Sequence, residues 1–384
     1  MSDEVKNFQQ DWVIAQGIEK KKIELQAKKN LLDERRYDNE LEKITKADRD
    51  LEIAKNTNFG ALGPDQISKL KKDMREYVEA AKDGMVFINK IFSGAVPFFR
   101  KNLIVVGART GGGKSTAVAN IVYETIRQKN KKTGERRKVL VITNEEKAED
   151  FYSRIVSLSK NYHYVNHDKF TDEMTAEFEA GIQALASNGT VTVVDDTFNG
   201  SSGLTKTLEG IKTIFSNLIR DKIYYDAVIL DYYQSITTST DNPKLDQYKV
   251  QELVAQLLDD MKNHYPAPIV VFAQSRVDDK DHTIPFDIRL KGAKLLSDKA
   301  TLTIEMIPNV KDLCTEWVIH KSRFTEGLSG TGFVTGYERG RFVEYDERFR
   351  MEVEKIKEKR AQNKLMANVF DKKDGKKDNT ENET

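Results

Sequence analysis

The chain has 384 residues, and its 62 Lys and Arg nearly balance its 61 Asp and Glu, which leaves a formal net charge of +1. This length allows one large domain or two modest ones, and the charge excludes a uniformly basic nucleic-acid coat while leaving room for a local basic patch. The single cysteine, Cys314, excludes a disulfide framework and a cysteine-rich zinc site. The sequence has no apolar run of transmembrane length and no signal peptide, so we expect a soluble cytoplasmic protein with no membrane partner.

Residues 1–62 predict a charged helical arm. Charged side chains dominate from about residue 17 to residue 56, and apolar residues recur, mostly by sevens, at Ile18, Leu25, Leu32 and, after a phase shift, at Leu41, Ile44 and Leu51. This spacing is typical of a coiled-coil contact with another chain. Because fewer than three clean heptads are present, a solvated charged helix is an equal alternative.

Residues 63–83 predict a linker helix. Gly60, Gly63 and Pro64 separate it from the arm, and Asp65 stands in its first turn. Apolar residues follow at helical spacing, at Ile67, Leu70, Met74, Tyr77 and Val78. We expect this apolar face to cover either the chain's own core or a neighbouring subunit.

Residues 84–348 predict an α/β core. Short apolar runs alternate with stretches of helical period, and the runs predict strands at 103–106, 139–142, 191–194, 227–230, 269–272, 302–306 and 316–320. Such alternation is typical of a mostly parallel sheet between layers of helices. Ligands bind such sheets at the carboxyl ends of the strands, so the residues after each strand are the candidates for chemistry.

A phosphate-binding loop follows the first predicted strand. It consists of Ala108, Arg109, Thr110, Gly111, Gly112, Gly113, Lys114, Ser115 and Thr116. Small residues let successive backbone N–H groups surround a phosphate, the lysine reaches the β- and γ-phosphates, and the serine hydroxyl joins the Mg²⁺ shell. The general motif has glycine where Ala108 stands, but the three later glycines still free the turn. We therefore predict binding of a nucleotide's phosphates together with Mg²⁺.

Polar residues at other strand ends extend this site. Asp231 follows an apolar run and predicts a second Mg²⁺ ligand. Glu145 and Glu146 follow another run, where a carboxylate can orient and deprotonate the attacking water, although an exposed surface pair is the commoner meaning. Gln274 predicts a contact with the γ-phosphate or its attacking water.

Lys321 and Arg323 lie two residues apart just past a late strand. Residues at this spacing on an extended segment face the same way, and two such cations can clamp a phosphoryl group. A pair of solvent-exposed cations is the alternative. The loop at 277–294 carries charges of both signs, and its composition alone indicates a solvated surface loop.

Together these motifs resemble those of the DnaB-like replicative ring helicases, which have a RecA-type core. The resemblance covers roughly residues 84–344. The family's first motif, A-R-x-x-x-G-K-[ST], is similar to the stretch that begins at Ala108, and its S-L-E-M is similar to residues 143–146. Its D-Y-L-Q resembles residues 231–234, the S-Q-L glutamine matches Gln274, and the K-x-R pair matches Lys321 and Arg323.

The resemblance implies an ATP-dependent DNA helicase that hydrolyses ATP between the subunits of a hexameric ring and moves 5′→3′ on single-stranded DNA. It implies Glu145 as the catalytic base and Gln274 as the γ-phosphate sensor. It also implies that Lys321 and Arg323 act on the neighbouring subunit's ATP, with Arg323 as the arginine finger. The alternatives are a RecA- or KaiC-type ATPase in recombination or signalling, and a nucleotide-switched loader or scaffold.

Residues 287–292 resemble the family's D-L-R-E-S-G channel loop, which implies DNA contacts by Arg289, Lys291 and Gly292. Leu290 departs from that pattern, because the family has glutamate there. In the place of the family's globular N-terminal domain we expect the arm and the linker helix, and we expect the arm to dock a primase, a loader or a polymerase. Residues 349–384 predict a charged disordered tail. This architecture favours a phage or plasmid enzyme, which would act in the host cytoplasm.

Overall fold

A computed structural model describes residues 63–92, 96–160, 170–197, 203–237, 247–275, 286–290, 294–323 and 329–358. The predicted arm and all of the predicted tail beyond residue 358 lie outside these residues. The chain consists of two compact units, Met1–Arg75 and Glu76–Thr384, and nearly all of the described residues belong to the second.

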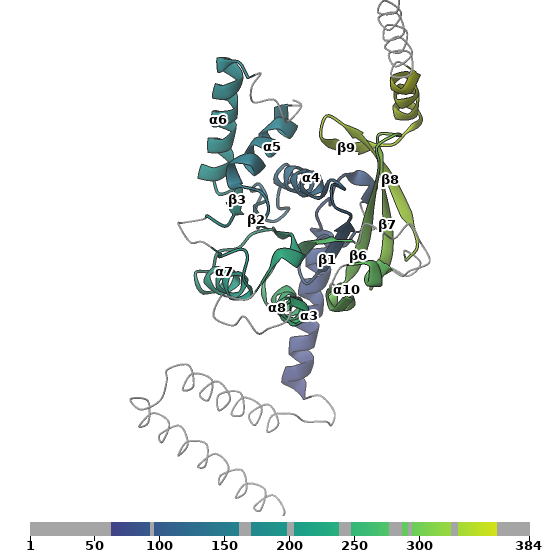
Figure 1. Cartoon of the computed structure of the whole chain (residues 1–384). Coiled ribbons are helices and arrows are strands. Elements are labelled where there is room, and N and C mark those ends of the chain that lie inside the picture. The colour runs from purple at the N-terminus through teal and green to yellow at the C-terminus, as the bar shows by residue number, and fades with distance from the viewer. Residues whose placement is uncertain are drawn as a thin grey trace, which may run out of the picture. The chain divides into compact units, whose positions relative to one another are not determined.

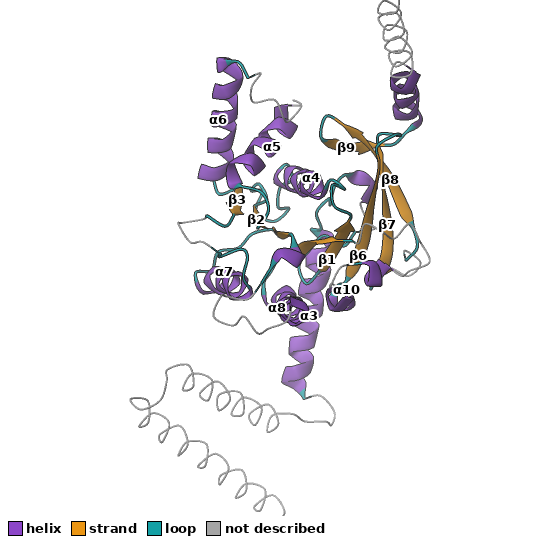
Figure 2. Cartoon of the chain, viewed as in Figure 1, coloured by secondary structure: helices purple, strands orange, loops and turns teal. Residues whose placement is uncertain are grey.

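One sheet dominates the described part of the second unit (Figures 1 and 2). Its strand order is β3-β2-β4-β5-β1-β6-β7-β8-β9. The strands are β1 Leu103–Ala108, β2 Val139–Thr143, β3 Val191–Val194, β4 Ala227–Asp231, β5 Ile269–Gln274, β6 Leu302–Asn309, β7 Cys314–Ser322, β8 Gly332–Glu338 and β9 Arg341–Glu344. From β3 to β6 all neighbours are parallel, and from β6 to β9 they are antiparallel. The predicted α/β core with a mostly parallel sheet is therefore confirmed.

Helices of the second unit cover both faces of this sheet (Figure 1). The described helices are α3 Pro64–Lys82, α4 Lys114–Ile126, α5 Ala148–Lys160, α6 Asp172–Ser187, α7 Leu208–Arg220, α8 Gln247–His264, α9 Phe286–Arg289 and α10 Lys294–Lys299, with short 3-10 turns η1 Lys90–Phe92 and η4 Tyr233–Ser235. Alternate residues of each strand face opposite sides. Ile104 and Val106 join α4 and α5 in one core, whereas Leu103 and Val105 join α7, α8 and α10 in the other. None of the described helices is long and apolar enough to cross a lipid bilayer.

Helix α3 occupies the region predicted as a linker helix. It begins at Pro64, a residue whose fixed φ and missing N–H suit the first position of a helix. Near its end, Tyr77 meets Phe99 edge-on with ring centres 5.4 Å apart, and Glu76 pairs with Arg100 at 3.0 Å. Its other apolar residues, Ile67, Leu70, Met74 and Val78, are between 41% and 70% exposed.

The C-terminal part of the fold differs from the prediction in two ways. Strands β8 and β9 were not predicted, because β8 contains two glycines and a mixed burial pattern, and β9 has only four residues. The predicted disordered tail begins too early, since residues 347–358 form a helix. Phe349 and Val353 are buried, and the Phe349 ring packs so closely on Gly336 that a Cβ there would come within 2.6 Å of it. The high charge of this segment concealed these two anchors.

Candidate active site

The loop between β1 and α4 has the backbone of a phosphate-binding turn. Gly111 and Gly113 adopt φ angles of 69° and 84°, in the left-handed region that favours glycine. A Cβ at Gly112 would lie 2.8 Å from the Arg109 carbonyl oxygen, so the turn excludes a side chain there as well. Helix α4 then begins at Lys114, and the N–H groups of its first turn, which have no partner within the helix, make this loop an anion site.

Ala108 replaces the first glycine of the general motif without cost. It is still part of β1, where it lies between Gln274 of β5 and Met306 of β6, and it is fully buried. Strand geometry accommodates any small side chain. The backbone leaves the sheet only after this residue, so the turn itself needs glycine at later positions and not at Ala108.

Two oxygens beside the loop fit a Mg²⁺ ion. The Ser115 hydroxyl lies 3.4 Å from Asp231 Oδ2, and the other carboxylate oxygen of Asp231 is buried without a hydrogen bond among the described residues. Burial, reinforced by the negative charges of Glu145 and Glu146, raises the pKa of Asp231 to about 7, although Lys114 opposes the shift. Magnesium commonly takes one or two protein oxygens, with phosphate and water completing its octahedron. The described residues offer no cluster of three or more His, Cys, Asp or Glu for a metal, which agrees with such a sparse site.

The structure separates the two neighbouring glutamates. Glu146 pairs with Arg154 at 2.5 Å and its side chain is largely buried, so its charge is committed to the fold. Glu145 is exposed, has no ion-pair partner among the described residues, and lines an open polar cavity together with Ser115. A carboxylate without an ion-pair partner that faces the Mg²⁺ site is the better candidate for a general base.

Gln274 reaches the phosphate loop. Its side-chain amide donates a hydrogen bond to the Thr110 hydroxyl, and its strand neighbour is Ala108. Residues from three different strands therefore meet at the carboxyl edge of the sheet, as the sequence predicted: the loop after β1, Asp231 at the end of β4 and Gln274 at the end of β5. Lys114 Nζ lies 5.7 Å from the centre of the Tyr232 ring, next to Asp231.

A largely apolar cavity adjoins the other side of the loop. It has a volume of about 280 Å³ and is lined by the glycines of the loop, Thr116 of α4, the β6–β7 connection, Tyr337 of β8 and Phe342 of β9. A cavity of this lining suits a flat heterocycle that continues from a bound phosphate chain.

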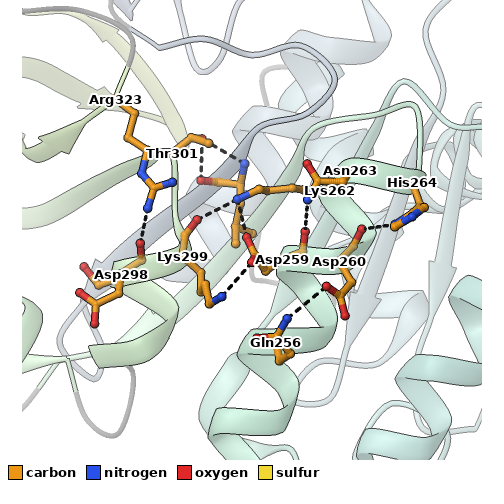
Figure 3. Close-up of polar contacts among 12 residues, drawn as sticks. Gln256, Asp259, Asp260, Lys262, Asn263, His264, Asp298, Lys299, Thr301 and Arg323 are labelled. Atoms are coloured by element: carbon orange, nitrogen blue, oxygen red, sulfur yellow. Dashed lines mark hydrogen bonds and ion pairs between the residues drawn. The ribbon is translucent and has the colours of Figure 1, made fainter. Parts of the chain in front are cut away.

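Lys321 and Arg323 lie elsewhere. Lys321 Nζ donates to the carbonyl oxygens of Ser297 and Asp298 at 2.7 and 2.8 Å. Arg323 Nη2 donates to the Asp298 carbonyl at 2.5 Å (Figure 3). The Arg323 backbone N–H donates to the Thr301 carbonyl, and the Thr301 N–H donates to the Leu103 carbonyl. Arg323 is thus level with the first residue of β1, whereas the phosphate loop follows the last.

Residues 80–295 match the sequence model of a protein family that is described as the DnaB-like helicase C terminal domain. The chain belongs to this family. It is therefore an ATP-hydrolysing helicase of the DnaB-like type.

Solved structures show the same fold. One similar structure is described as an ATPase domain, with a TM-score of 0.56, 14% identity and coverage of 73% of this chain and 99% of that one. Another is a DnaB-like replicative helicase whose structure describes its interactions with primase, with a TM-score of 0.55, 14% identity and coverage of 88% and 77%. No curated protein sequence matches significantly. The predicted resemblance to DnaB-like helicases and the RecA-type core are confirmed.

Two positioning residues of this helicase were not predicted. Asn144 exchanges two hydrogen bonds of 3.0 Å with the backbone of Tyr232, which ties the loop carrying Glu145 to the end of β4. Gln234 does the same for Gln274, accepting from its N–H at 2.8 Å and donating to its carbonyl at 3.0 Å. In the sequence, Asn144 and Gln234 are recognisable only as amide side chains shortly after a buried strand. This pattern does not indicate which backbone group each one binds.

The structure places Arg289 in a buried ion pair rather than at the surface that the predicted DNA contact requires. Its guanidinium makes two hydrogen bonds, at 2.5 and 2.8 Å, to the buried Glu305 of β6, and His320 Nε2 lies 2.8 Å from the same carboxylate. Burial alone would raise the pKa of Glu305, but the hydrogen bonds from His320 and Arg289 outweigh it and hold the pKa below its usual value. The His320 ring also stacks on Phe286 at 4.4 Å. Arg289 thus anchors α9 to the sheet, while Lys291 and Gly292 lie outside the described residues.

Replacing Arg289 with methionine should destabilise this helicase. Glu305 would remain buried with one partner fewer, and breaking a buried ion pair costs about 3–5 kcal/mol. Urea unfolding of the single variant should show this loss, and the double variant with Glu305→Met should recover much of it. Unchanged stability combined with a shallower salt dependence of DNA binding would instead place Arg289 on the DNA.

Replacing Asp231 with asparagine should stabilise the nucleotide-free protein at alkaline pH while abolishing ATP hydrolysis. The folded-state pKa of Asp231 is raised to about 7, above its unfolded value, so folding favours the protonated acid and stability falls as the pH rises between the two values. At pH 8 the variant should gain on the order of 1–4 kcal/mol, and near pH 4 it should gain little. Thermal unfolding in EDTA at both pH values measures the difference, and an equal effect at both would contradict the assignment.

Proposed function

We propose that this helicase hydrolyses Mg·ATP at the interfaces of a hexameric ring and uses the turnover to move 5′→3′ along single-stranded DNA. The site of each subunit would then be completed by Lys321 and Arg323 of its neighbour. The subunits would assemble in the cytoplasm, which for a phage enzyme is that of the host.

One observation carries the proposal of a shared site: Arg323 is level with the start of β1, whereas the phosphate loop of the same chain follows the end of β1. Thr303 pairs with Lys321 and, on its other side, with Val105, while Ala108 pairs with Met306 nearer the carboxyl edge. Arg323 is level with Leu103, five residues before the end of β1, and at about 3.3 Å per residue this is a separation of about 16 Å. An arginine side chain cannot span that distance to its own γ-phosphate, which supports a phosphoryl target in another subunit.

Within each site the chain's own residues would divide the work. Lys114 and the loop amides would hold the phosphates, and Ser115 and Asp231 would hold Mg²⁺, which would supply positive charge to offset that of the phosphates. Glu145 orients the attacking water and accepts its proton, while Gln274 contacts the γ-phosphate. The base of ATP would occupy the apolar cavity beside Thr116.

Ring assembly would use the exposed apolar side of α3. Ile67, Leu70, Met74 and Val78 recur at helical spacing and are exposed in the single chain, and such a stripe favours burial against another subunit. Lys291 and Gly292 would grip the DNA backbone in the ring's channel, since near-zero net charge requires only local basic loops there. The arm at 1–62 would dock a primase, a loader or a polymerase.

Mass photometry and fork unwinding test the proposal together. With Mg²⁺, a slowly hydrolysed ATP analogue and single-stranded DNA, the full chain should have the mass of a hexamer. With ATP it should unwind a fork bearing a 5′ tail, and not one bearing only a 3′ tail. Lys114→Ala is the matched inactive control.

Other outcomes would favour the alternatives. Strand pairing without unwinding would indicate a recombinase-type ATPase, and slow hydrolysis that DNA does not stimulate would indicate a loader or scaffold. If deletion of residues 1–56 leaves hexamers and unwinding intact, the arm docks a partner rather than assembling the ring.

A further inference from the structure

The C-terminal end of α10 binds three cations from two other elements. Its last three carbonyl oxygens belong to Ser297, Asp298 and Lys299. Lys321 binds the first two. Arg323 binds the second, and Lys262 Nζ of α8 donates to the third at 3.0 Å (Figure 3). The carbonyls at a helix C-terminus lack partners within the helix and carry partial negative charge, so they attract cations.

Lys262 differs from the other two cations because it is buried. It is 7% exposed, although it is a lysine, and its ammonium group also pairs with Asp259 at 2.5 Å. Burial by itself would raise the pKa of Asp259, but hydrogen bonds from Lys262 and Lys299 outweigh it and lower the pKa. Buried lysines occur almost only where they are paired and hydrogen-bonded, and such a pair holds its surroundings in one geometry. Lys299 Nζ forms a further ion pair, of 3.1 Å, with the second carboxylate oxygen of Asp259.

The backbone on both sides of the cation pair is also held. Thr301, two residues after α10, is buried and exchanges hydrogen bonds of 3.1 and 2.9 Å between its hydroxyl and the backbone of Leu103. The Arg323 backbone N–H donates to the Thr301 carbonyl. The side chains of Lys321 and Arg323, by contrast, are placed by the end of α10, and the end of α10 is fastened to α8 through Lys262.

We propose that Lys262 is a positioning residue for ATP hydrolysis in the neighbouring subunit: with Asp259 it fastens the end of α10, whose carbonyl oxygens set the positions of Lys321 and Arg323. The proposal rests on the shared site proposed above. It places Lys262 away from its own nucleotide and on the donor side of the interface. Loosening the anchor would displace the two cations, and a displacement of about 1 Å at a reacting group can cost about 100-fold in rate.

Mixed assemblies of the full chain test this inference. The reference mixture combines Lys114→Ala subunits, which donate the cation pair but cannot use ATP, with Arg323→Ala subunits, which use ATP but lack the finger. Adding Lys262→Met to the donor subunits should lower kcat of the mixture by about 10-fold to 100-fold with KM for ATP nearly unchanged. Adding Lys262→Met to the ATP-using subunits instead should leave kcat within about 2-fold of the reference.

Three outcomes overturn the inference. An equal loss in both placements would show that Lys262 serves only the fold, and no loss in the donor placement would show that α10 does not depend on it. If the reference mixture itself recovers no activity, the shared site fails and this inference fails with it. If the reference mixture recovers activity and Lys262→Met in the donor subunits does not lower it, only the role of Lys262 is overturned and the shared site stands.

Matched variants distinguish the loss of this anchor from a general loss of folding. Lys249 lies on the same helix, is exposed and pairs with Glu252 one turn away, so Lys249→Met in the donor should have no effect. Lys262→Arg keeps the charge and should retain more activity than Lys262→Met. Should Lys262→Met fail to fold, Asp259→Asn weakens the same anchor from the other side and should give the same asymmetry between donor and ATP-using subunits.

Discussion

Replacing Arg323 with alanine should reduce the DNA-stimulated kcat for ATP by about 10³–10⁵-fold, the range found for arginine fingers in other phosphate-loop enzymes. The residues proposed to hold the nucleotide and Mg²⁺, the phosphate loop and Asp231, are unchanged in the variant, so the affinity for ATP should fall only a few-fold. The structure explains why kcat should fall far more than the affinity for ATP. Arg323 is level with the start of β1, at the edge of the sheet away from the phosphate loop of its own chain. Steady-state hydrolysis and fluorescent-nucleotide binding measure the two quantities.

An experiment with mixed subunits distinguishes an arginine finger, which acts on the neighbouring subunit's ATP, from a residue that only supports the fold. Arg323→Ala subunits mixed with Lys114→Ala subunits should recover part of the activity that neither has alone, because one supplies the loop and the other the finger. Arg348→Ala is the matched control, since Arg348 is an exposed arginine of the helix at 347–358. Absence of recovery, with both variants folded and assembled, would place Arg323 in its own subunit's site or outside catalysis.

Replacing Glu145 with glutamine should lower kcat by about 10²–10⁴-fold while ATP and Mg²⁺ still bind, because the amide keeps the shape of the side chain but cannot accept the water's proton. Removing the charge near Asp231 should also ease ionisation of that buried carboxyl, because Glu145 is among the groups that raise its pKa. Single-turnover hydrolysis measures the chemical step directly. Metal-dependent nucleotide binding shows that the site is otherwise intact.

Two neighbouring glutamates provide controls of different kinds. Glu149→Gln alters an exposed carboxylate that lines the same open cavity and should leave hydrolysis nearly unchanged. Glu146→Gln weakens the pair with Arg154 and should act through stability rather than through the chemical step. A loss of kcat in Glu146→Gln that matches Glu145→Gln at equal stability would move the catalytic base to Glu146.

Local sequence patterns were enough to predict the central sheet and to bring the candidate nucleotide-binding residues to one edge of it. Every predicted strand is present. The parallel strands β1, β2, β4 and β5 are buried on both faces and are therefore nearly continuous apolar runs, whereas β6 and β7 are mixed in polarity. The phosphate loop was recognisable because its chemistry is local: glycines at consecutive positions, then lysine and a hydroxyl at the first turn of a helix. Asp231 and Gln274 could be predicted for a related reason, since the carboxyl ends of parallel strands share one edge.

Features that depend on partners far apart in the chain became visible only in the folded structure. Arg289 resembled an exposed loop cation, but it pairs with Glu305 across a register that no local pattern encodes. Strands β8 and β9 and the anchored helix after them depend on packing around Gly336 and Phe349 rather than on hydrophobic period. Lys321 and Arg323 were identified as a pair, yet only the antiparallel turn from β6 to β7 carries them back to the far edge of the sheet. Local composition determines which chemistry a residue can perform, whereas strand register and burial determine what lies within its reach.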